Sequence, residues 1–567
     1  MAETLLSPGV LARETDQSFI EGQPVQAGAA IIGPAVKGPV NIPTLVSSFS
    51  EYQSVFGGAV TSASVQYSYL TSTAANNYFS QGGSSLLVTR VVSGSFTPAK
   101  SKNILNADAA VAFQLATLAE GDIMNSISGS SGNLGTADNV IWEITSANTS
   151  SGTFSIAIRR GDSTSTDKKV LEEFRNVSLD PKQNNYISKV IGDLSKSART
   201  DGTDHYIQVS GSYVNKSKFV RVLSVDTPTP DFFDQAGAAK AAFTGSIPAV
   251  GSGFFNYASG SLNAVSLGAN KFNENISTTN IQGVGPADYN TAISLMTNKD
   301  DFRFNILSAP GLNKSDHATQ ITSIKSCVEG RQDSIAVIDL DGYGTGISTI
   351  VTEANGMDSS YVATYWPWLQ TVDPLVGGSV WVPASTMVPG VYAFTDKSSD
   401  PWFAPAGITR GALGNVIRAE RKLTAGNRDT LYEANVNPIA TFPGSGVVVF
   451  GQKTLQKRAS ALDRVNVRRL LIAVKSFISQ ISDNLVFEQN SAATRNSFLT
   501  SVNPYLESVQ QRQGLYAFKV VMDESNNTAD VVDRNELVGQ IFLQPTKTAE
   551  FIILDFNVLP TGATFPA

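Results

Sequence analysis

Hydrophobic residues recur at helical spacing most regularly in the segment that begins near Asn466. The apolar positions, three or four residues apart, are Val467, Leu470, Leu471, Val474, Ile478, Ile481 and Leu485. This spacing predicts a helix with one buried stripe, because residues at these intervals share a helical face. Burial of each large aliphatic side chain is worth about 1.5–3 kcal/mol, more than a surface ion pair contributes. Arg468, Arg469 and Lys475 fall off the stripe, so we expect them to remain available to solvent or to a partner.

This helix belongs to the last of several predicted units. A strand is expected over residues 446–451, and a second helix is expected to start at Pro504, where Asn503 is a suitable cap. Strand patterns follow near the terminus, the last of them over residues 551–558. We therefore predict a C-terminal α/β domain over residues 437–567, ending in a strand whose edge has no obvious partner in the last residues of its own chain.

Alternation of apolar and polar residues marks a different region, residues 93–225, which is rich in Ser, Thr, Asn and Gly. Residues 140–145 and 153–160 alternate and are separated by Ser-Gly turns. The alternation places Val140, Trp142 and Ile144 on one face and Ile141, Glu143 and Thr145 on the other. This pattern is typical of a sheet with one solvated side, so we predict a mostly β outer insertion domain.

Strand and helix patterns alternate on both sides of this insertion. The expected strands cover residues 29–32, 86–92, 303–307 and 334–340, and the expected helices include residues 67–79 and 315–329. Such alternation is typical of βαβ units. We therefore predict an α/β core domain made of residues 25–92 and 226–436, preceded by an extended arm over residues 1–24. The predicted fold class is a multidomain α/β protein.

Composition and charge narrow the range of partners. Apolar residues make up 42 % of the 567 residues and charged residues 16 %, below the roughly 25 % of a typical soluble domain, so we expect much of the surface to meet partners. The net charge of -7 includes no long run of one sign, which argues against nucleic-acid binding. Because Cys327 is the only cysteine, no intrachain disulfide can form, as suits assembly in a reducing cytoplasm. No secretory signal and no apolar run of ~20 residues is present, so we expect a soluble subunit without direct membrane insertion.

Candidate catalytic residues are few. His205 and His317 are the only histidines and lie outside any metal or hydrolase motif, so ordinary surface or packing roles are favoured. Asp339 and Asp341 end a strand before a glycine-rich turn, a place that can hold a magnesium ion or a phosphate. No dinucleotide pattern or P-loop lysine follows, so we predict no catalytic, metal or cofactor-binding residues and no cofactor. A metal-dependent enzyme built on these two carboxylates remains the alternative from another class.

The aromatic cluster and the single cysteine are interpreted as core residues. Tyr361, Tyr365, Trp366 and Trp368 are residues of the kind that forms sugar platforms or base-stacking surfaces, but the adjoining prolines favour packing in a tight connection. Cys327 reads as a small buried hydrophobe rather than a nucleophile.

Short motifs follow one another in order from the beginning of the chain to its end. In the first half they are Ser7-Pro-Gly-Val10, GPAVKGPV at 33–40, PTLVSSF at 43–49, FGG at 56–58, EEFRNVSLDP at 172–181 and NYISKVI at 185–191. In the second half they are AVID at 336–339, YWPWL at 365–369, VPAS at 382–385, GVY at 390–392, WFAPA at 402–406, NP at 437–438, FPG at 442–444, GVVVFG at 446–451, VNVRRLL at 465–471 and AEFI at 549–552. Together these motifs resemble the contractile tail sheath family of phages.

The resemblance implies a structural subunit rather than an enzyme. Members of this family polymerise as stacked hexameric rings around a tail tube, in a virion tail assembled in the host cytoplasm. Contraction of the helical lattice drives the tube through the host envelope without a nucleotide. The partners implied are further copies of the chain, the tail tube protein, and the baseplate and tail terminator proteins. A sheath from a phage-tail-like bacteriocin or an extracellular injection system shares the fold and remains an alternative, and a host-surface adhesin is a less favoured one.

The resemblance also implies which segments join the subunits. The arm over residues 1–24 would join the C-terminal domain of a neighbouring subunit, and the terminal strand would complete a shared sheet. The expected linking residues are Pro8, Gly9, Val10, Phe551, Ile552, Ile553, Leu554 and Phe556. The C-terminal domain would face the tube, and we hypothesise that Arg468, Arg469, Lys475 and Arg495 meet an acidic tube surface.

Overall fold

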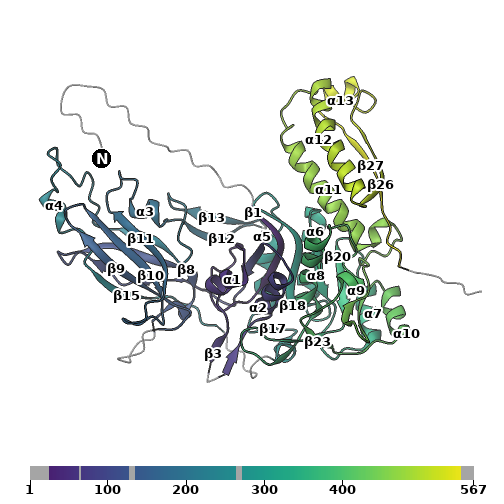
Figure 1. Ribbon diagram of the computed structural model, residues 1–567, viewed down its shortest axis with the longest axis horizontal. Helices are drawn as coiled ribbons and strands as arrows, with labels where there is room; N and C mark the ends of the chain where they lie inside the picture. The colour runs from purple at the N-terminus through teal and green to yellow at the C-terminus, as the bar shows by residue number, and fades with distance from the viewer. Residues whose placement is uncertain (1–24, 63–64, 127–134, 203, 263–270, 551–567) are drawn as a thin grey trace, which may run out of the picture.

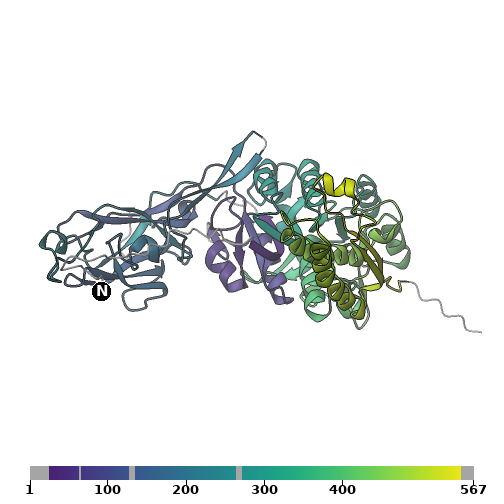
Figure 2. The same ribbon diagram turned by 90° about the horizontal axis from the view of Figure 1, so that it is seen from above.

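The computed structural model of the chain describes residues 25–62, 65–126, 135–202, 204–262 and 271–550. The molecule has three parts (Figure 1): a β-rich part and a central α/β part, which follow one another along the long axis, and an arm of helices and a hairpin that projects sideways from the central part. Seen from above, the β-rich part and the helices of the other two parts lie at opposite ends (Figure 2). The predicted α/β fold class is confirmed: the described residues form a mixed α/β structure with several sheets.

The central part is built on an eight-stranded sheet with the order β2-β5-β1-β18-β19-β20-β24-β25. Its strands are β1 (Val25–Gly33), β2 (Thr44–Val46), β5 (Leu86–Arg90), β18 (Phe302–Asn313), β19 (Ile335–Asp339), β20 (Val362–Trp366), β24 (Asn437–Phe442) and β25 (Gly446–Val449). The strands from β5 to β24 run parallel, and β2 and β25 pair antiparallel at the two edges. A parallel sheet must be covered on both faces, and every residue of β19 and β20 is accordingly buried.

Helices cover both faces of this sheet. The cluster that includes Ile31 and Val337 is covered by α1 (Phe49–Phe56), α2 (Leu70–Ser80) and α8 (Ala384–Ser398). The cluster that includes Leu307 and Ile338 is covered by α5 (Tyr289–Leu295), α6 (Ala318–Arg331), α7 (Ile347–Asn355) and α10 (Ala425–Glu433). The helices predicted over 67–79 and 315–329 correspond to α2 and α6.

The β-rich part holds a second sheet, with the order β11-β10-β9-β15-β6-β8-β14 and a short β7 (Ile104–Leu105) beside β8. Its strands are β6 (Pro98–Ser101), β8 (Val111–Glu120), β9 (Val140–Asn148), β10 (Thr153–Arg160), β11 (Val170–Ser178), β14 (Val220–Val225) and β15 (Gly251–Asn256). Val140, Trp142 and Ile144 are buried while Thr145 is exposed, as the alternation predicts. Ile141, expected on the solvated face, is buried as well. The sheet extends past residue 225, because β15 lies between β9 and β6.

Buried cations join the β-rich part to the central part. Arg90, which is 0 % exposed, donates hydrogen bonds to the carbonyl oxygens of Gly38 at 2.7 Å, Glu120 at 2.9 Å and Ala35 at 3.1 Å. The Lys37 ammonium donates to a carbonyl oxygen of the second part, that of Asp138, at 2.9 Å. Burial lowers the pKa of Lys37. We call the contacts made by Arg90 and Lys37 the junction.

The projecting arm consists of α11 (Val465–Asp483), α12 (Ala492–Gln511), and a hairpin of β26 (Leu515–Val521) and β27 (Gln540–Pro545) that carries the short helix α13 (Ala529–Asp533). Leu470 and Val474 of α11 are buried in the arm's own cluster, with Ile478, Ile481 and Leu485 partly buried against it. The predicted helix and its apolar stripe are thus confirmed. Val465 and Ile472, in contrast, belong to the cluster of the central part, so α11 anchors the arm at its base.

The prediction that a helix starts at Pro504 is wrong. Pro504 lies inside α12, which begins after Ser491, whose hydroxyl accepts a hydrogen bond from the Thr494 amide at 3.2 Å. A proline inside a helix leaves the carbonyl four residues earlier without a helical donor. That carbonyl belongs to Thr500, an exposed residue, so water can replace the missing donor.

Smaller elements complete the chain. They are β3 (Val60–Ser62), β4 (Val65–Tyr67), α3 (Ile187–Val190), β12 (Ser195–Asp201), β13 (Asp204–Ser210), α4 (Ala241–Thr244), β16 (Ile276–Ser277), β17 (Asn280–Ile281), β21 (Leu369–Val372), β22 (Ser379–Val382), α9 (Gly407–Arg410) and β23 (Val416–Ala419). Ile207 of the β12–β13 hairpin packs against the core of the central part. Among the described residues, no helix is both long and apolar enough to cross a membrane.

Candidate functional site

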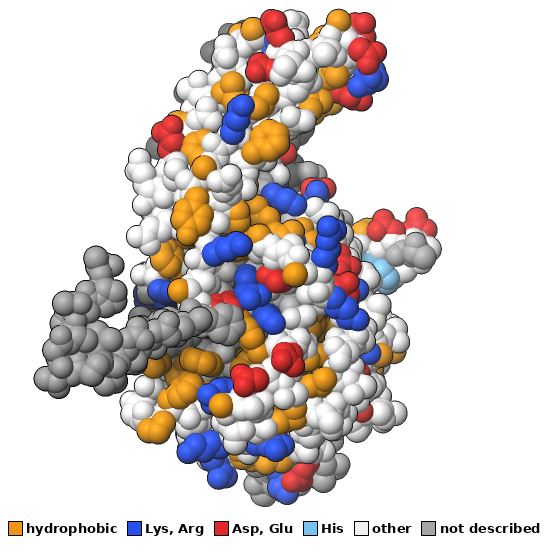
Figure 3. All heavy atoms as spheres, turned by 90° about the vertical axis from the view of Figure 1, so that its right-hand side faces the viewer, with side chains coloured by type: hydrophobic (Ala, Val, Ile, Leu, Met, Phe, Trp, Pro, Cys, Tyr) orange, Lys and Arg blue, Asp and Glu red, His pale blue; other side chains and the backbone are white. Residues whose placement is uncertain are grey.

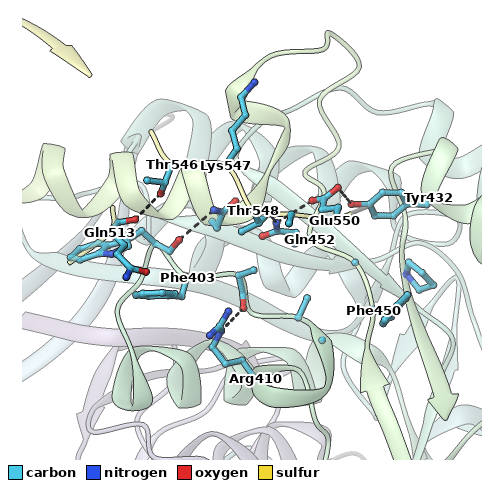
Figure 4. Close-up of a pocket in the computed structure, with 18 of the residues that line it drawn as sticks. Phe403, Arg410, Tyr432, Phe450, Gln452, Gln513, Thr546, Lys547, Thr548 and Glu550 are labelled. Carbon is cyan, nitrogen blue, oxygen red and sulfur yellow. Dashed lines mark hydrogen bonds between the residues drawn. The ribbon is translucent and has the colours of Figure 1, made fainter. Parts of the chain in front are cut away.

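A groove of about 980 Å³ lies where the projecting arm meets the central part. Its lining comes from five stretches of chain: 402–410, 428–432, 438–466, 510–516 and 546–550. Figure 4 shows side chains that line the groove. Figure 3 shows the molecule from the right-hand side of Figure 1, where Lys and Arg side chains gather over the central part. Because the lining residues are far apart in sequence, the groove exists only in the folded chain.

One wall of the groove is fixed to the arm through Trp402. The Trp402 indole is buried and donates from Nε1 to the carbonyl oxygen of Arg512 at 3.0 Å. The Arg512 guanidinium lies 4.8 Å from the centre of the Trp402 ring and forms an ion pair with Asp400 at 2.6 Å. The side-chain amide of Asn466 also donates to the Trp402 carbonyl oxygen, at 3.3 Å. These contacts hold the wall in a single position against α11 and α12.

Two arginines stack on aromatic rings along the groove. The Arg410 guanidinium lies 5.2 Å from the centre of the Phe403 ring, and that of Arg428 lies 5.4 and 5.8 Å from the rings of Phe442 and Phe450. Stacking on a ring holds a guanidinium in place while its edge N–H groups can still meet an acceptor. Arg410 donates from Nε to the Ala404 carbonyl oxygen at 3.1 Å, and Arg428 donates from Nη1 to that of Leu423 at 3.4 Å. Neither guanidinium forms an ion pair with a described residue.

A cluster around Glu550 closes one end of the groove. Its carboxylate accepts two hydrogen bonds from Arg464, at 2.7 Å from Nε and 2.9 Å from Nη2. It also accepts from the Tyr432 hydroxyl at 2.9 Å and from the Gln452 side-chain amide at 3.1 Å. The same Gln452 amide donates to the Thr548 hydroxyl at 2.6 Å (Figure 4). Three separate elements of the chain therefore hold one carboxylate, and we call this group the Glu550 cluster.

The cluster is charged although it is partly buried. Burial opposes ionisation of Glu550, but the hydrogen bonds from Arg464, Tyr432 and Gln452 outweigh it and lower the pKa of that carboxyl. Burial, reinforced by the Glu550 carboxylate, raises the pKa of the Tyr432 phenol, which thus remains a donor. Burial and the neighbouring Arg464 lower the pKa of Lys453, whose ammonium lies 4.3 Å from the Tyr432 ring.

The β26–β27 hairpin beside the groove is a sheet with only its own two strands among the residues described. Its inner face, which includes Phe518 and Leu543, packs against the arm's core. Its outer face carries Tyr516 and Phe542, which are 63 % and 56 % exposed. The outward edges of a two-stranded sheet present unpaired backbone groups, which are a template for an added strand.

The predicted linking residues cannot be placed. Pro8, Gly9 and Val10, and Phe551, Ile552, Ile553, Leu554 and Phe556, lie outside the described residues. Glu550, the residue before this second group, is the last one described.

The expectation that Arg468 and Arg469 remain available to solvent or to a partner is wrong, because both are buried and bonded within the chain. Arg468 and Arg469 are each 4 % exposed. Arg468 donates to the Ser360 carbonyl oxygen at 3.2 Å and lies over a tyrosine ring, and Arg469 donates to both carboxylate oxygens of Asp396 at 2.6 Å. Arginine side chains usually bury their stems and keep the charged head in water, but at the base of α11 the central part occupies that place. These arginines therefore tie the arm to the central part.

The other two residues of the tube-contact hypothesis differ from each other. Arg495 is 9 % exposed and donates to the side-chain oxygen of Asn490 at 2.7 Å, so it too is occupied within the chain. Lys475 is exposed and lies 3.2 Å from the side-chain oxygen of Gln332. The structure thus leaves one of the four cations, Lys475, on the surface.

The two carboxylates at the end of β19 are placed differently from each other. The Asp339 carboxylate is buried and accepts hydrogen bonds from the Ser385 backbone amide at 3.1 Å and from the Ser385 hydroxyl. It thereby caps the first turn of α8. Asp341 is partly exposed and accepts from the amide of Gly342 at 2.7 Å. The described residues include no group of three or more His, Cys, Asp or Glu side chains able to hold a metal ion.

The remaining candidates are placed as follows. His317 is buried, with Nδ1 at 3.2 Å from the Asn313 amide and Nε2 at 2.9 Å from the Ser277 carbonyl oxygen, and His205 pairs with Thr200 on the β12–β13 hairpin. Core packing of the aromatic cluster is confirmed, since Tyr365, Trp366 and Trp368 are buried and Tyr361 packs against the core clusters that include Tyr365 and Trp366. Cys327 is buried, as predicted.

The sequence alone does not identify the groove. Arg410, Arg428 and Tyr432 are ordinary residues of short helices, and only the fold brings them to Glu550. One signal was available: Glu550 is a lone carboxylate directly before four apolar residues, 551–554, where a charge needs a partner.

Two family models match the chain. The model of the phage tail sheath protein central domain matches residues 282–455, and that of the phage tail sheath C-terminal domain matches residues 458–559. The tail sheath protein of Vibrio phage KVP40 is 35 % identical over 263 residues, covering 46 % of this chain and 39 % of the relative. That of Enterobacteria phage T4 is 36 % identical over 230 residues, covering 41 % of this chain and 35 % of the relative. The matched part thus spans less than two fifths of these relatives' length.

The fold has a counterpart among solved structures. A sheath tail protein from Listeria innocua superposes with a TM-score of 0.51 at 11 % identity, covering 92 % of this chain and 95 % of the other. At this identity the likeness concerns the fold alone. It extends beyond the residues that the two family models match.

Proposed function

The chain belongs to the phage tail sheath family, and from this membership we propose that it is the structural subunit of a contractile tail sheath. In this proposal the subunits polymerise as stacked hexameric rings around a tail tube and contract to drive the tube through a host envelope. The partners are further copies of the chain, the tube protein, and the baseplate and terminator proteins of a virion tail. A bacteriocin or injection-system sheath would use the same subunit chemistry.

The observation that carries the proposal is the groove beside the unpaired β26–β27 hairpin. The groove offers aromatic surface and two stacked arginines, and the hairpin offers free backbone edges. An extended segment added to such an edge gains hydrogen bonds of about 0.5–1.5 kcal/mol each. The free energy of one such contact between subunits is modest, but a lattice repeats the contact at every subunit. A contact that repeats without closing produces a helical polymer.

The arm over residues 1–24 has the chemistry to occupy the groove of a neighbour. It carries four carboxylates, Glu3, Glu14, Asp16 and Glu21, and one cation, Arg13. It also carries the apolar pairs Leu5-Leu6, Val10-Leu11 and Phe19-Ile20. Carboxylates complement the stacked guanidiniums of the groove, and apolar side chains complement its rings.

The first test is assembly of the purified chain, observed by negative-stain microscopy and by sedimentation. We expect the full chain to form long tubes and a chain without residues 1–20 to remain folded but unpolymerised. The double variant Arg410→Glu, Arg428→Glu should also fail to assemble, because its new carboxylates repel the acidic N-terminal arm, residues 1–24. Its matched control is Arg175→Glu, a reversal at a side chain that is 74 % exposed in the β-rich part.

Three outcomes would contradict the proposal. Tubes that persist without residues 1–20 would show that the arm does not link the subunits. A full chain that never polymerises but gains stability or turnover from a divalent ion would favour the enzyme alternative at Asp339 and Asp341. Binding of cells by the isolated β-rich part, again without polymers, would favour an adhesin.

A further inference from the structure

The Glu550 cluster does more than close the groove, because of where it lies in the chain. Glu550 follows β27 by five residues and directly precedes the proposed linking strand. Its three partners all belong to the other side of the groove: Tyr432 to α10, Gln452 to the segment after β25, and Arg464 to the N-cap of α11. The cluster therefore ties the C-terminal segment to the central part rather than to the hairpin.

The tie is stronger than a surface ion pair. The Glu550 and Arg464 side chains are 18 % and 24 % exposed, and the contact uses two donors of one guanidinium. Paired arginine–carboxylate hydrogen bonds of this geometry are among the strong ones, and they fix direction as well as distance. Asp463 lies 3.1 Å from Arg464, so this arginine keeps one carboxylate neighbour if Glu550 is lost.

The hairpin opposes a pull on the chain with one ladder of backbone hydrogen bonds. Among the described residues β27 is paired with β26 alone, over residues 540–545, and the hairpin is stabilised further by the packing of its inner face on the core of the projecting arm. A pull on the chain just after β27 would open this ladder pair by pair from its end. A force applied at residue 551 instead acts on Glu550 first. The hydrogen bonds from Arg464 and Tyr432 then transmit this force to the start of α11 and to α10.

We propose that Glu550 is the anchor of the C-terminal linking segment, so that a neighbour's pull on residues 551–567 reaches the central part and bypasses the β26–β27 hairpin. This inference rests on the proposed function, since it needs a second copy to receive the segment. The anchor also sets the reach of the link. The segment after Glu550 spans at most about 60 Å when extended, and release of residues 546–550 would add roughly 17 Å of slack.

The test compares Glu550→Gln with Glu536→Gln, which removes an exposed ion pair with Arg534 on the same hairpin. Glu550→Asp, which keeps the charge on a shorter side chain, is the rescue variant. As monomers, all three should match the wild type in hydrogen exchange of residues 515–545. In assembly, Glu550→Gln should need about tenfold more protein to polymerise, with Glu550→Asp intermediate and Glu536→Gln unchanged.

A second readout distinguishes an anchor from a merely structural contact. In polymers of Glu550→Gln, residues 515–545 should exchange faster than in wild-type polymers, because the neighbour's pull now opens the hairpin. Equal assembly and equal exchange would overturn the anchor while wild-type tubes leave the proposed function standing. A hairpin already unprotected in the Glu550→Gln monomer would also overturn it, since the cluster would then support the hairpin itself. A wild-type chain that forms no tubes would instead contradict the proposed function, and the anchor with it.

Discussion

At the scale of single residues, the buried carboxylate of Asp339 is the most unusual group of the central part. It faces the first turn of α8 and, among the described residues, receives hydrogen bonds from Ser385 alone. Burial raises its pKa to about 7, although the two hydrogen bonds oppose the shift. The helix N-terminus favours a negative charge here, but desolvation outweighs that effect.

This carboxylate makes stability depend on pH. Its pKa of about 7 in the folded chain lies above the ordinary value of 3.8, so between these pH values the folded state holds a proton that the unfolded chain has lost. Stability should therefore fall as pH rises through this window and level off above it. We expect Asp339→Asn to reduce the fall in chemical denaturation measured from pH 5 to pH 8, and Glu120, whose pKa burial also raises to about 7, to account for part of the fall that is left. An unchanged slope, with the exposed Glu507→Gln as control, would contradict this assignment.

Residue roles were the least predictable from sequence. Helical spacing placed Arg468 and Arg469 off the apolar stripe, which is correct, but spacing does not show what lies opposite. In the fold, Asp396 at the end of α8 and Ser360 before β20 meet these arginines. Partners more than seventy residues away leave no local trace in a sequence.

At the scale of elements, the packing of α11 determines the stability of the projecting arm. Leu470, which is 1 % exposed, packs among the residues of both helices and the hairpin. Leu470→Ala should lower the free energy of unfolding by about 2–5 kcal/mol, because the site cannot collapse around the lost volume. Leu485→Ala, beyond the end of the helix and only partly buried, is the matched control and should cost much less. Similar losses for both variants, measured by denaturant unfolding, would contradict a core centred on Leu470.

Periodicity predicted the existence of elements better than their ends. β10 spans 153–160 as expected, and α6 and α11 lie within three residues of their expected starts. The start predicted at Pro504 failed because tertiary packing overrides local signals: Val502 and Leu506, on either side of the proline, are both buried in the arm's core. A proline can be read as a boundary only where packing does not hold the helix.

At the scale of the whole molecule, the junction determines whether the β-rich and central parts behave as one body. Arg90→Met removes a donor from four carbonyl oxygens, those of Ala35, Val36, Gly38 and Glu120. The Gly38 oxygen keeps the Glu120 amide at 3.2 Å, and each buried oxygen left without a partner costs about 1–3 kcal/mol. We expect faster proteolysis and faster hydrogen exchange near Glu120 in this variant. Lys218→Met breaks the ion pair with Glu51 at the same boundary, where the lysine is 62 % exposed, and should change little. A junction as protected in Arg90→Met as in the wild type would contradict this role.

The alternation of patterns predicted βαβ units, but it did not predict the order of strands. β18 and β19 are neighbours in the sheet, as successive strands of such a unit usually are. The position of β1 between β5 and β18 could not be predicted, since β18 follows β1 by some two hundred and seventy residues of chain. The groove was equally hidden, because its lining comes from five stretches of chain between residues 402 and 550 that only the fold brings together.

The placement of β1 also determines when the central sheet can be completed during synthesis on the ribosome. β1 and β5 emerge early, but β18, which pairs with the other edge of β1, begins only at Phe302. At usual rates of translation, about 10–40 s separate Arg90 from Phe302. During that interval the nascent chain has an open parallel edge while the β-rich part is being completed, so premature pairing with a second nascent chain is the hazard that its biosynthesis must avoid.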